Sequence, residues 1–283
     1  MNIEYDLNMN KIISVLVFFI AINVNTSGQF SVSEIYGAKT NGLGTCLTNL
    51  NGMQCIYGNV AGLDEIKNFG MDFNVENRFQ TFNLSSVGFG FAKNLGKIGT
   101  IGLTLKRFGI SEYNELQVGL NFARKLSSNF SIGLRLNMYN LVIEEYGNRI
   151  AANADIGVQY RLNDKFSIGF YVINPFPVKF TDDINLPTIA FLGVKYSLSS
   201  NMVVLAELEK HFDFNYVIKA GIQLDLNNKI AIYGGFRNDM EGFSDYSLGL
   251  KFDFNDNLQM NLSTQYNLTF GISPGLSISY NLE

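Results

Sequence analysis

A five-residue pattern recurs along the chain from residue 84 to its end. In each copy an apolar residue is followed by glycine, a second apolar residue, a variable residue and a third apolar residue. The copies are residues 87–91, 101–105, 118–122, 132–136, 156–160, 168–172, 192–196, 220–224 and 248–252. In a strand, positions 1, 3 and 5 share one face and positions 2 and 4 the other. The pattern therefore predicts β-strands with one apolar face and one face that carries glycine.

The face that carries glycine also carries most of the charge of these segments. Its charged residues are Arg135, Asp155, Arg161, Lys195, Lys219, Asp225, Lys251 and Asp253. In a soluble sandwich this face would be the surface, where a glycine in nearly every strand would weaken the sheet. A glycine that faces a crowded interior leaves room for packing or curvature. We therefore expect the apolar face to meet lipid and the glycine face to line a lumen.

Two kinds of connector alternate between the expected strands. Six short Asn-, Asp-, Ser- or Gly-rich turns lie at residues 93–97, 127–129, 163–165, 199–201, 227–229 and 255–257. Seven longer connectors lie near residues 78–83, 107–114, 141–150, 174–187, 209–215, 237–245 and 267–275. Thirteen connectors join fourteen strands, and short turns at one end with longer loops at the other are typical of outer-membrane barrels. Because a bilayer leaves no unpaired sheet edge, the sheet is expected to close.

These observations predict an all-β fold, a closed antiparallel transmembrane β-barrel that spans residues 68–283 and lies in the outer membrane. The expected strands are residues 68–79, 84–92, 98–106, 115–126, 130–141, 151–162, 166–173, 188–198, 202–209, 216–226, 230–237, 244–254, 258–267 and 274–282.

The charge content agrees with a chain whose surface meets lipid. Charged residues make up 16% of the sequence, whereas about 25% is usual in soluble domains. The net charge of −4 argues against a nucleic-acid partner, because phosphate binding needs a basic field. Outer-membrane lipid is the expected surrounding.

The N-terminus has the layout of a secretory signal. The apolar run 12–22 follows Lys11 and has about eleven residues, too few for a membrane-spanning helix, which needs about twenty. Small residues at Thr26 and Gly28 follow it, as at a cleavage site. We expect residues 1–28 to be a signal peptide.

The two cysteines, Cys46 and Cys55, lie in the exported part of the chain. Disulfides persist in such compartments, and this pair would close a short loop. Two cysteines carry little information on pairing, so a disulfide and a pair of buried free thiols are both open interpretations.

Residues 29–67 interrupt the repeat and carry a short motif. Its residues are Gly37, Ala38, Gly42 and Gly44, followed by Asn59, Ala61 and Leu63. The motif resembles the N-terminal signature of the FadL-type long-chain fatty acid transporters and, more closely, of the PorV/PorQ-like proteins of Bacteroidota. Those families have an aromatic-x-Asn-Pro-Ala-x-Leu element before the barrel; here Val60 stands where they have proline.

The resemblance implies that residues 29–67 form a hatch, or plug, in the lumen; the alternative is a periplasmic tail. It also implies two different functions. FadL-type members carry hydrophobic molecules inward, whereas PorV-like members act as outer-membrane components of the type IX secretion machinery.

Nothing in the sequence predicts a catalytic site, a metal site or a cofactor. His211 is the only histidine, and it lies beside Glu209 and Asp213 at the end of an expected strand. A catalytic triad or a His-rich metal site has no further histidine to draw on. The sequence therefore favours a non-enzymatic protein with a solvated histidine at the rim.

The loop after residue 173 offers apolar groups at the expected outer mouth, namely Phe176, Val178 and Phe180. They could bind a hydrophobic ligand, bind another protein, or pack over the barrel mouth. Because the lumen face is polar and mixed in charge, we favour a PorV-like barrel that binds secretion or assembly proteins. The alternative is a FadL-like transporter of hydrophobic small molecules.

Overall fold

The computed structural model describes residues 36–145, 147–176, 178, 186–212, 215–240 and 242–282. The signal peptide expected at residues 1–28 lies outside the described residues. Within the described ranges, no helix has both the length and the apolar character needed to cross a membrane.

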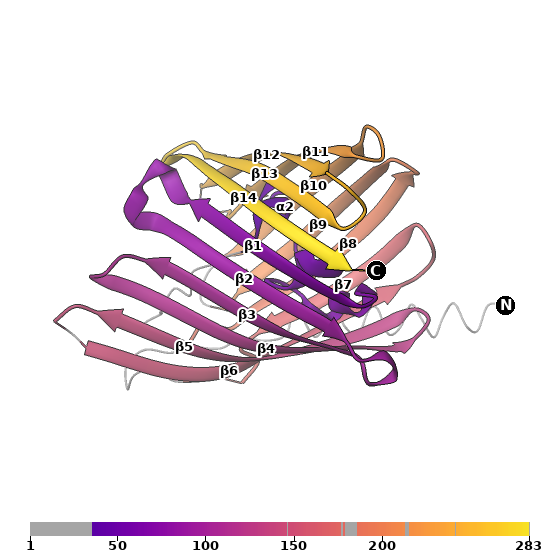
Figure 1. The fold of residues 1–283 in the computed structure, drawn as a ribbon. Coiled ribbons are helices and arrows are strands. Elements are labelled where there is room, and N and C mark those ends of the chain that lie inside the picture. Colours follow the sequence, from indigo (N-terminus) through magenta and orange to yellow (C-terminus); the bar gives the residue numbers. More distant parts are fainter. Residues whose placement is uncertain are drawn as a thin grey trace.

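Fourteen strands form one closed antiparallel barrel, in which each strand pairs with its neighbours along the chain and β1 pairs with β14 (Figure 1). The predicted fold class and strand number are confirmed. The strands are β1 (Phe69–Asn77), β2 (Ser85–Asn94), β3 (Thr100–Gly109), β4 (Tyr113–Ser127), β5 (Phe130–Ile143), β6 (Gly147–Arg161), β7 (Phe166–Ile173), β8 (Ile189–Ser199), β9 (Met202–His211), β10 (Tyr216–Asp225), β11 (Ile230–Asn238), β12 (Ser244–Asp253), β13 (Leu258–Asn267) and β14 (Gly271–Leu282).

Three of the short turns are built in the same way around an asparagine. The Oδ1 atom of Asn227 accepts hydrogen bonds from the backbone N–H groups of Lys229 (2.8 Å) and Ile230 (2.9 Å). Asn163 and Asn255 make the same pair of bonds two and three residues ahead. Asparagine favours such turns because its short side chain replaces a backbone acceptor, so these positions fix where the hairpins reverse.

Several of the connectors predicted to be long are shorter than expected. Strand β3 continues to Gly109 and β4 begins at Tyr113, so the predicted connector 107–114 reduces to three residues. Likewise β5 ends at Ile143 and β6 begins at Gly147. Backbone hydrogen bonds extend the ladders into these regions; the N–H of Ile110 donates to the carbonyl of Tyr113 (2.9 Å). Propensity alone could not reveal this extension, because pairing with the neighbouring strand supplies it.

Along the strands, apolar side chains face outward and the alternate positions face inward, as predicted. Apolar side chains such as Phe73, Leu120, Leu136 and Leu248 are 42–64% exposed on the outside of the barrel. The polar and glycine positions point inward and are largely buried. Aromatic rings also pair near both ends of the strands: Phe69 lies 6.0 Å from Tyr280 at the short-turn end, and Phe243 and Phe270 stack at 5.9 Å at the other.

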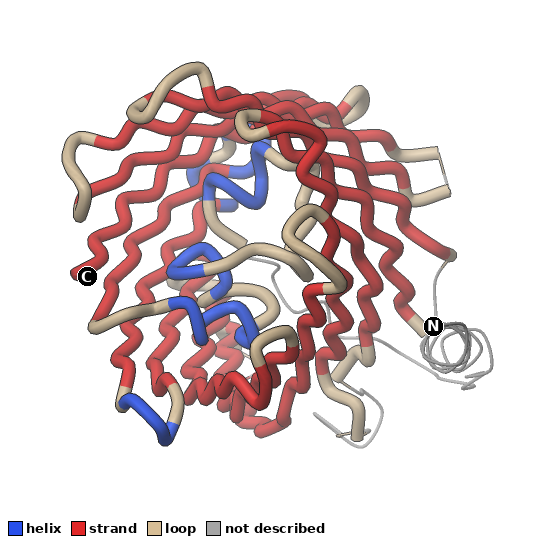
Figure 2. The backbone as a smooth tube through the Cα atoms, turned by 90° about the vertical axis from the view of Figure 1, so that its right-hand side faces the viewer, coloured by secondary structure: helices blue, strands red, loops and turns tan. Residues whose placement is uncertain are grey.

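The chain before β1 runs inside the barrel, and we call residues 36–67 the inner segment. Its helical turns, α2 (Ala38–Gly42), η1 (Gly52–Cys55) and η2 (Val60–Glu65), are enclosed by the ring of strands (Figure 2). Three further short turns lie between strands: η3 (Arg78–Gln80), η4 (Phe82–Leu84) and η5 (Gly96–Ile98).

Candidate functional site

The inner segment fills the lumen with buried side chains. Leu43, Met53, Ile56 and Val60 are all fully buried, and together with residues of the strands they form the largest apolar cluster of the described residues. The helical turns are too short to be stable alone, since isolated helices under about twelve residues are marginal in water. Contacts with the strands therefore determine the conformation of the segment.

Glycines of the strands make room for this segment. A Cβ atom on Gly157 would lie 2.0 Å from Oδ1 of Asn59, and a Cβ atom on Gly133 would lie 2.4 Å from the backbone nitrogen of Ala61. The other strand glycines whose Cβ position would approach the segment within 3.0 Å are Gly70, Gly88, Gly90, Gly169, Gly193, Gly221 and Gly235. Six of the nine glycines at the second position of the sequence pattern thus lie where the wall and the segment come closest.

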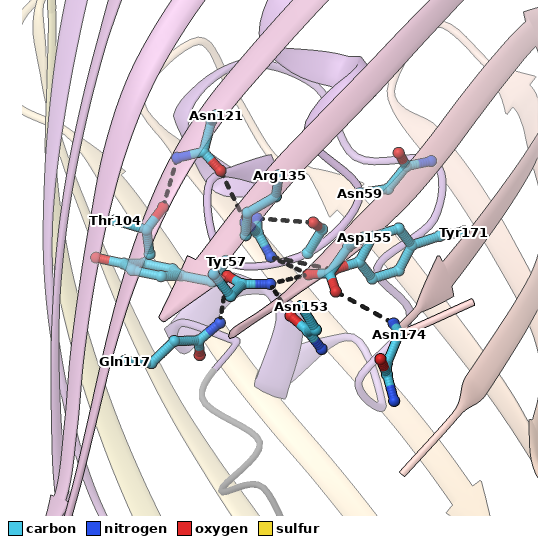
Figure 3. A network of polar contacts seen from close by, with 12 residues as sticks. Tyr57, Asn59, Thr104, Gln117, Asn121, Arg135, Asn153, Asp155, Tyr171 and Asn174 are labelled. Atoms are coloured by element: carbon cyan, nitrogen blue, oxygen red, sulfur yellow. Dashed lines mark hydrogen bonds and ion pairs between the residues drawn. The ribbon is translucent and has the colours of Figure 1, made fainter. Parts of the chain in front are cut away.

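Arg135 on β5 connects the segment to the wall on one side of the lumen (Figure 3). Its Nη2 atom donates to the backbone carbonyls of Ile56 (2.6 Å) and Gly58 (2.9 Å). Its Nη1 atom donates to the hydroxyl of Tyr171 (3.0 Å) and lies 3.6 Å from Oδ2 of Asp155. The buried charge is therefore paired with Asp155, and its other donors bond to the segment and to the wall, which offsets part of its desolvation cost.

Neighbouring amides and hydroxyls extend this cluster. The Nε atom of Arg135 donates to Oδ1 of Asn121 (2.7 Å), and Nδ2 of Asn121 donates to Oγ1 of Thr104 (2.7 Å). The Thr104 hydroxyl in turn donates to the carbonyl of Ile56 (3.1 Å). Two strand side chains, Arg135 and Thr104, thus hold the same backbone carbonyl.

A second buried cluster holds the segment on another part of the wall, at β9 and β10. Glu207 on β9 accepts hydrogen bonds from the backbone N–H groups of Leu47 (2.9 Å) and Thr48 (2.8 Å) and from the Thr48 hydroxyl (2.8 Å). Lys219 on β10 donates to Glu207 (3.1 Å) and to the carbonyl of Thr45 (3.1 Å). These contacts anchor residues 45–48 to two neighbouring strands.

His211 belongs to the edge of this second cluster. Its Nε2 atom lies 2.6 Å from Oε1 of Glu209, and the other oxygen of Glu209 lies 2.6 Å from Nζ of Lys219. Asp213, the other acid considered beside this histidine, lies outside the described residues. No group of three or more His, Cys, Asp or Glu in the described ranges is placed to hold a metal ion.

The motif residues of the inner segment serve its close packing. Gly37 precedes α2 with a φ of 91°, and Ala38 is fully buried. Gly42 lies against the ring of Tyr233, and Gly44, with a φ of 65°, approaches the backbone of β10 and β11, where a Cβ would meet the carbonyl of Ala220 at 2.5 Å.

The side chain of Asn59 makes hydrogen bonds within the inner segment and to β6. Its Oδ1 atom accepts from the N–H of Ala61 (3.1 Å), which caps η2. Its Nδ2 atom donates to the carbonyls of Thr48 (2.9 Å) and Val158 (3.1 Å). Ala61 and Leu63 are fully buried beside it. The structure therefore brings the two halves of the motif into one packed segment.

In the structure Cys46 and Cys55 are both buried and are both free thiols, one of the two interpretations that the sequence left open. The Sγ atom of Cys55 donates to the carbonyl of Leu50 (2.9 Å), a local partner. Burial raises the pKa of both thiols. A thiol with a raised pKa is a poor nucleophile, and both side chains act as small packing groups.

Two described residues of the loop after β7 lie against the inward face of the neighbouring strands. The side chains of Val178 and Leu186 pack with Tyr139, Leu141 and Ala151, which point inward from β5 and β6. Phe176, by contrast, is 67% exposed, and Phe180 lies outside the described residues.

The residues that hold the segment and were not singled out from the sequence include Thr48, Thr104, Tyr171 and Glu207. The signal that could have found Glu207 is its position, since it occupies an inward-facing place within the apolar run 202–208 of β9. The partners of Thr48 and Tyr171 depend on how the segment folds inside the barrel, and no periodicity encodes that.

No protein-family model and no curated protein matches this chain. Solved structures do match its fold. The toluene transporter TodX of Pseudomonas putida superposes with a TM-score of 0.70 at 11% identity, covering 91% of this chain and 100% of TodX. The toluene transporter TbuX of Ralstonia pickettii gives 0.67 at 12% identity, covering 88% and 99%.

The CymD monoaromatic hydrocarbon channel also matches, with a TM-score of 0.67 at 12% identity over 88% of this chain and 98% of CymD. These proteins are channels and transporters. Identities this low establish a common architecture without fixing function. The chain therefore has the fold of the monoaromatic hydrocarbon channels, a closed barrel of fourteen antiparallel strands.

Proposed function

We propose that this chain is an outer-membrane channel for hydrophobic small molecules, of the FadL-like kind, with the inner segment as its hatch. The observation that carries the proposal is the similarity in fold to hydrocarbon channels over most of both chains. The apolar outer face and the aromatic pairs near both ends of the strands support a bilayer location. From the sequence alone, the PorV-like function was favoured over the FadL-like one. The similarity in fold reverses this preference.

An apolar surface at the mouth supports a hydrophobic ligand. Tyr139, Leu141 and Ala151 point into a lumen whose other inward positions are mostly polar or glycine, and Val178 and Leu186 of the loop cover them. Inward-facing apolar residues contribute nothing to insertion in lipid. A small hydrophobic molecule that displaced the loop would find apolar contacts there.

Passage through the barrel requires a change in the inner segment. The segment is anchored by two buried charged clusters, around Arg135 and around Lys219. A solute therefore crosses only after part of the segment shifts, and in this proposal the segment acts as a hatch.

Uptake measurements test the proposal. Cells that lack the chain are complemented with the wild type, with Leu141→Thr at the mouth, or with Leu136→Thr on the outer face of the same strand. We expect the wild type to restore uptake of labelled toluene, Leu141→Thr to lower the initial rate severalfold, and Leu136→Thr to leave it near wild type. Equal uptake with and without the chain would contradict the proposal.

The second candidate function is the PorV-like one, in which the barrel binds secretion or assembly proteins. Exposed apolar side chains on the loops favour it: Phe176 is 67% exposed, Phe270 53% and Phe243 40%. Contiguous exposed apolar groups often mark protein contacts. Recovery of secretion components with the detergent-solubilised barrel, reduced when Phe176 is changed to Ser, would support this function; recovery of the barrel alone would count against it.

A further inference from the structure

A cavity of about 230 Å³ lies at the short-turn end of the barrel, between the inner segment and the wall. It is lined by the turns at 128–129 and 163–165, by side chains of β4 to β8, and by Asn51, Asp64 and Glu65 of the inner segment. Its volume is below the range of about 300–1,000 Å³ that is usual for drug-sized ligands. The cavity therefore suits a molecule of a few non-hydrogen atoms.

Lys195 on β8 lines this cavity and has no partner in the described part of the chain. Its side chain is half-buried and faces inward, like Gly193 two residues earlier, which lies against the inner segment. The residues opposite Lys195 in the sheet are Ser167 on β7 and Leu205 on β9. Neither of them carries a charge, so the neighbouring strands offer no counter-ion. No described residue accepts a hydrogen bond from its Nζ atom or forms an ion pair with it.

Each of the other inward-facing lysines and arginines of the described strands has an acceptor within the protein. They are Lys106, Lys125, Arg135, Arg149, Arg161, Lys219, Arg237 and Lys251. A partly buried ammonium group without a counter-charge is unfavourable. An anion that enters the cavity would therefore stabilise Lys195 in a way that no residue of the described strands does.

Two acids of the lining are already engaged by other residues. Glu65 lies 2.8 Å from Nη2 of Arg161 and 3.8 Å from Nζ of Lys125. Asp64 accepts a hydrogen bond from the hydroxyl of Ser131. The third acid, Asp164, is exposed on its turn.

The lining as a whole carries an excess of positive charge. Its three carboxylates face four cationic side chains, those of Lys125, Arg161, Lys165 and Lys195, which leaves one positive charge. The charge of Lys195 extends beyond the cavity: burial, and then repulsion by Lys251 and Lys195, lowers the pKa of Lys39. A single negative charge would balance the lining, whereas a second one would be repelled by the carboxylates of Asp64 and Asp164.

Three side chains of the lining have donors to spare for such an anion. Besides the ammonium group of Lys195, the guanidinium group of Arg161 uses its Nη2 atom for Glu65 and keeps its other N–H donors. The side-chain amide of Asn51 has no partner among the described residues. Carboxylate oxygens accept from all three kinds of donor. We infer that this cavity is a binding site for a small monocarboxylate of the size of acetate or lactate. The inference goes beyond the proposed channel function and does not depend on it.

Saturation-transfer NMR on the full chain in an uncharged detergent, at low ionic strength, tests the inference. The probes are acetate and lactate. Acetamide, which has the shape of acetate without its charge, and succinate, a dianion, are the comparisons. Lys195→Met removes the charge and keeps most of the length of the side chain, and Lys195→Arg restores a positive charge. The matched control is Lys229→Met, because Lys229 is an exposed lysine on the turn between β10 and β11, outside the cavity.

We expect acetate or lactate to bind, with an affinity about tenfold lower in Lys195→Met, as the loss of one charge-assisted hydrogen bond predicts. Lys195→Arg and Lys229→Met should bind within about twofold of the wild type. Since Lys195 has no partner to lose, Lys195→Met should fold as well as the wild type, which its migration on unheated gels checks. If it does not fold, Asn51→Leu takes its place. The inference would be overturned if neither monocarboxylate binds, if acetamide or succinate binds as tightly as acetate, or if the affinity is unchanged in the variant.

Discussion

At the scale of single residues, glycines in the strands make the space that the inner segment fills. Each glycine opposite the inner segment leaves the space of one methyl group, and the segment approaches the strand backbone there. The sequence predicted that these glycines face a crowded interior. It could not predict which atom each of them faces, such as Asn59 opposite Gly157, because those pairs depend on the path of a segment without periodicity.

Replacing Gly157 with alanine should destabilise the protein by about 1–3 kcal/mol, the usual cost of overpacking. The added Cβ would lie 2.0 Å from Oδ1 of Asn59, so the cap of η2 and its contact with β6 must shift. Gly234→Ala is the control, since its Cβ meets only a side-chain atom of Ile222, at 3.2 Å. Urea unfolding in detergent micelles measures both; an equal stability of the two variants would show that the segment adapts freely.

Lys219→Met should cost about 3–5 kcal/mol, because it leaves the buried carboxylates of Glu207 and Glu209 without their common cation. The matched control is Lys251→Met. Lys251 also pairs with an acid, Asp253, at 2.8 Å, but that pair is partly exposed, and exposed pairs contribute about 1 kcal/mol or less. The same unfolding measurement applies, and losses of similar size in both variants would contradict this account of the second cluster.

At the scale of elements, strands and inner segment follow different rules. The strands could be placed from alternation and from Asn-rich turns, and their number was predicted correctly. Their ends at the long-loop side were placed less well, because the ladder between Gly109 and Tyr113 continues beyond the apolar pattern. The inner segment has only short helical turns, and its conformation comes from the wall that surrounds it.

The inner segment should be sensitive to alkaline pH through Lys39. Burial, and then repulsion by Lys251 and Lys195, lowers the pKa of Lys39 from 10.5 to about 8. Between these two values the unfolded state binds more protons than the folded one, so the free energy of unfolding rises with pH in this window. Below about pH 8 Lys39 is charged in both states, and the free-energy cost of burying its charge in the folded protein is fully present.

The change that checks this is Lys39→Met, which removes the titrating group. The difference in unfolding free energy between wild type and Lys39→Met should move in favour of the wild type as the pH increases from about 8 to about 10.5. Comparing the two proteins cancels the titration of other groups. A difference that stays constant across this range would show that Lys39 is solvated in the folded state.

At the scale of the whole molecule, a barrel with a filled lumen should conduct ions poorly. In planar bilayers we expect the wild type to give small, infrequent conductance steps. The double variant Arg135→Met/Glu207→Gln weakens both clusters that hold the inner segment and should give larger and more frequent steps. Leu136→Thr, on the lipid-facing side of β5, is the control and should behave like the wild type. Large, steady conductance in the wild type would contradict the role of the segment as a hatch.

The pairing of β1 with β14 carries a consequence for biogenesis. The chain enters β1 directly from the inner segment, and the last strand completes the ring through contacts from Phe69 with Leu282 to Glu76 with Gly275. A segment held by two desolvated charge clusters cannot thread into a ring that is already sealed. Residues 36–67 must therefore take their place before β1 pairs with β14, so the inner segment is packed against the strands before the barrel closes.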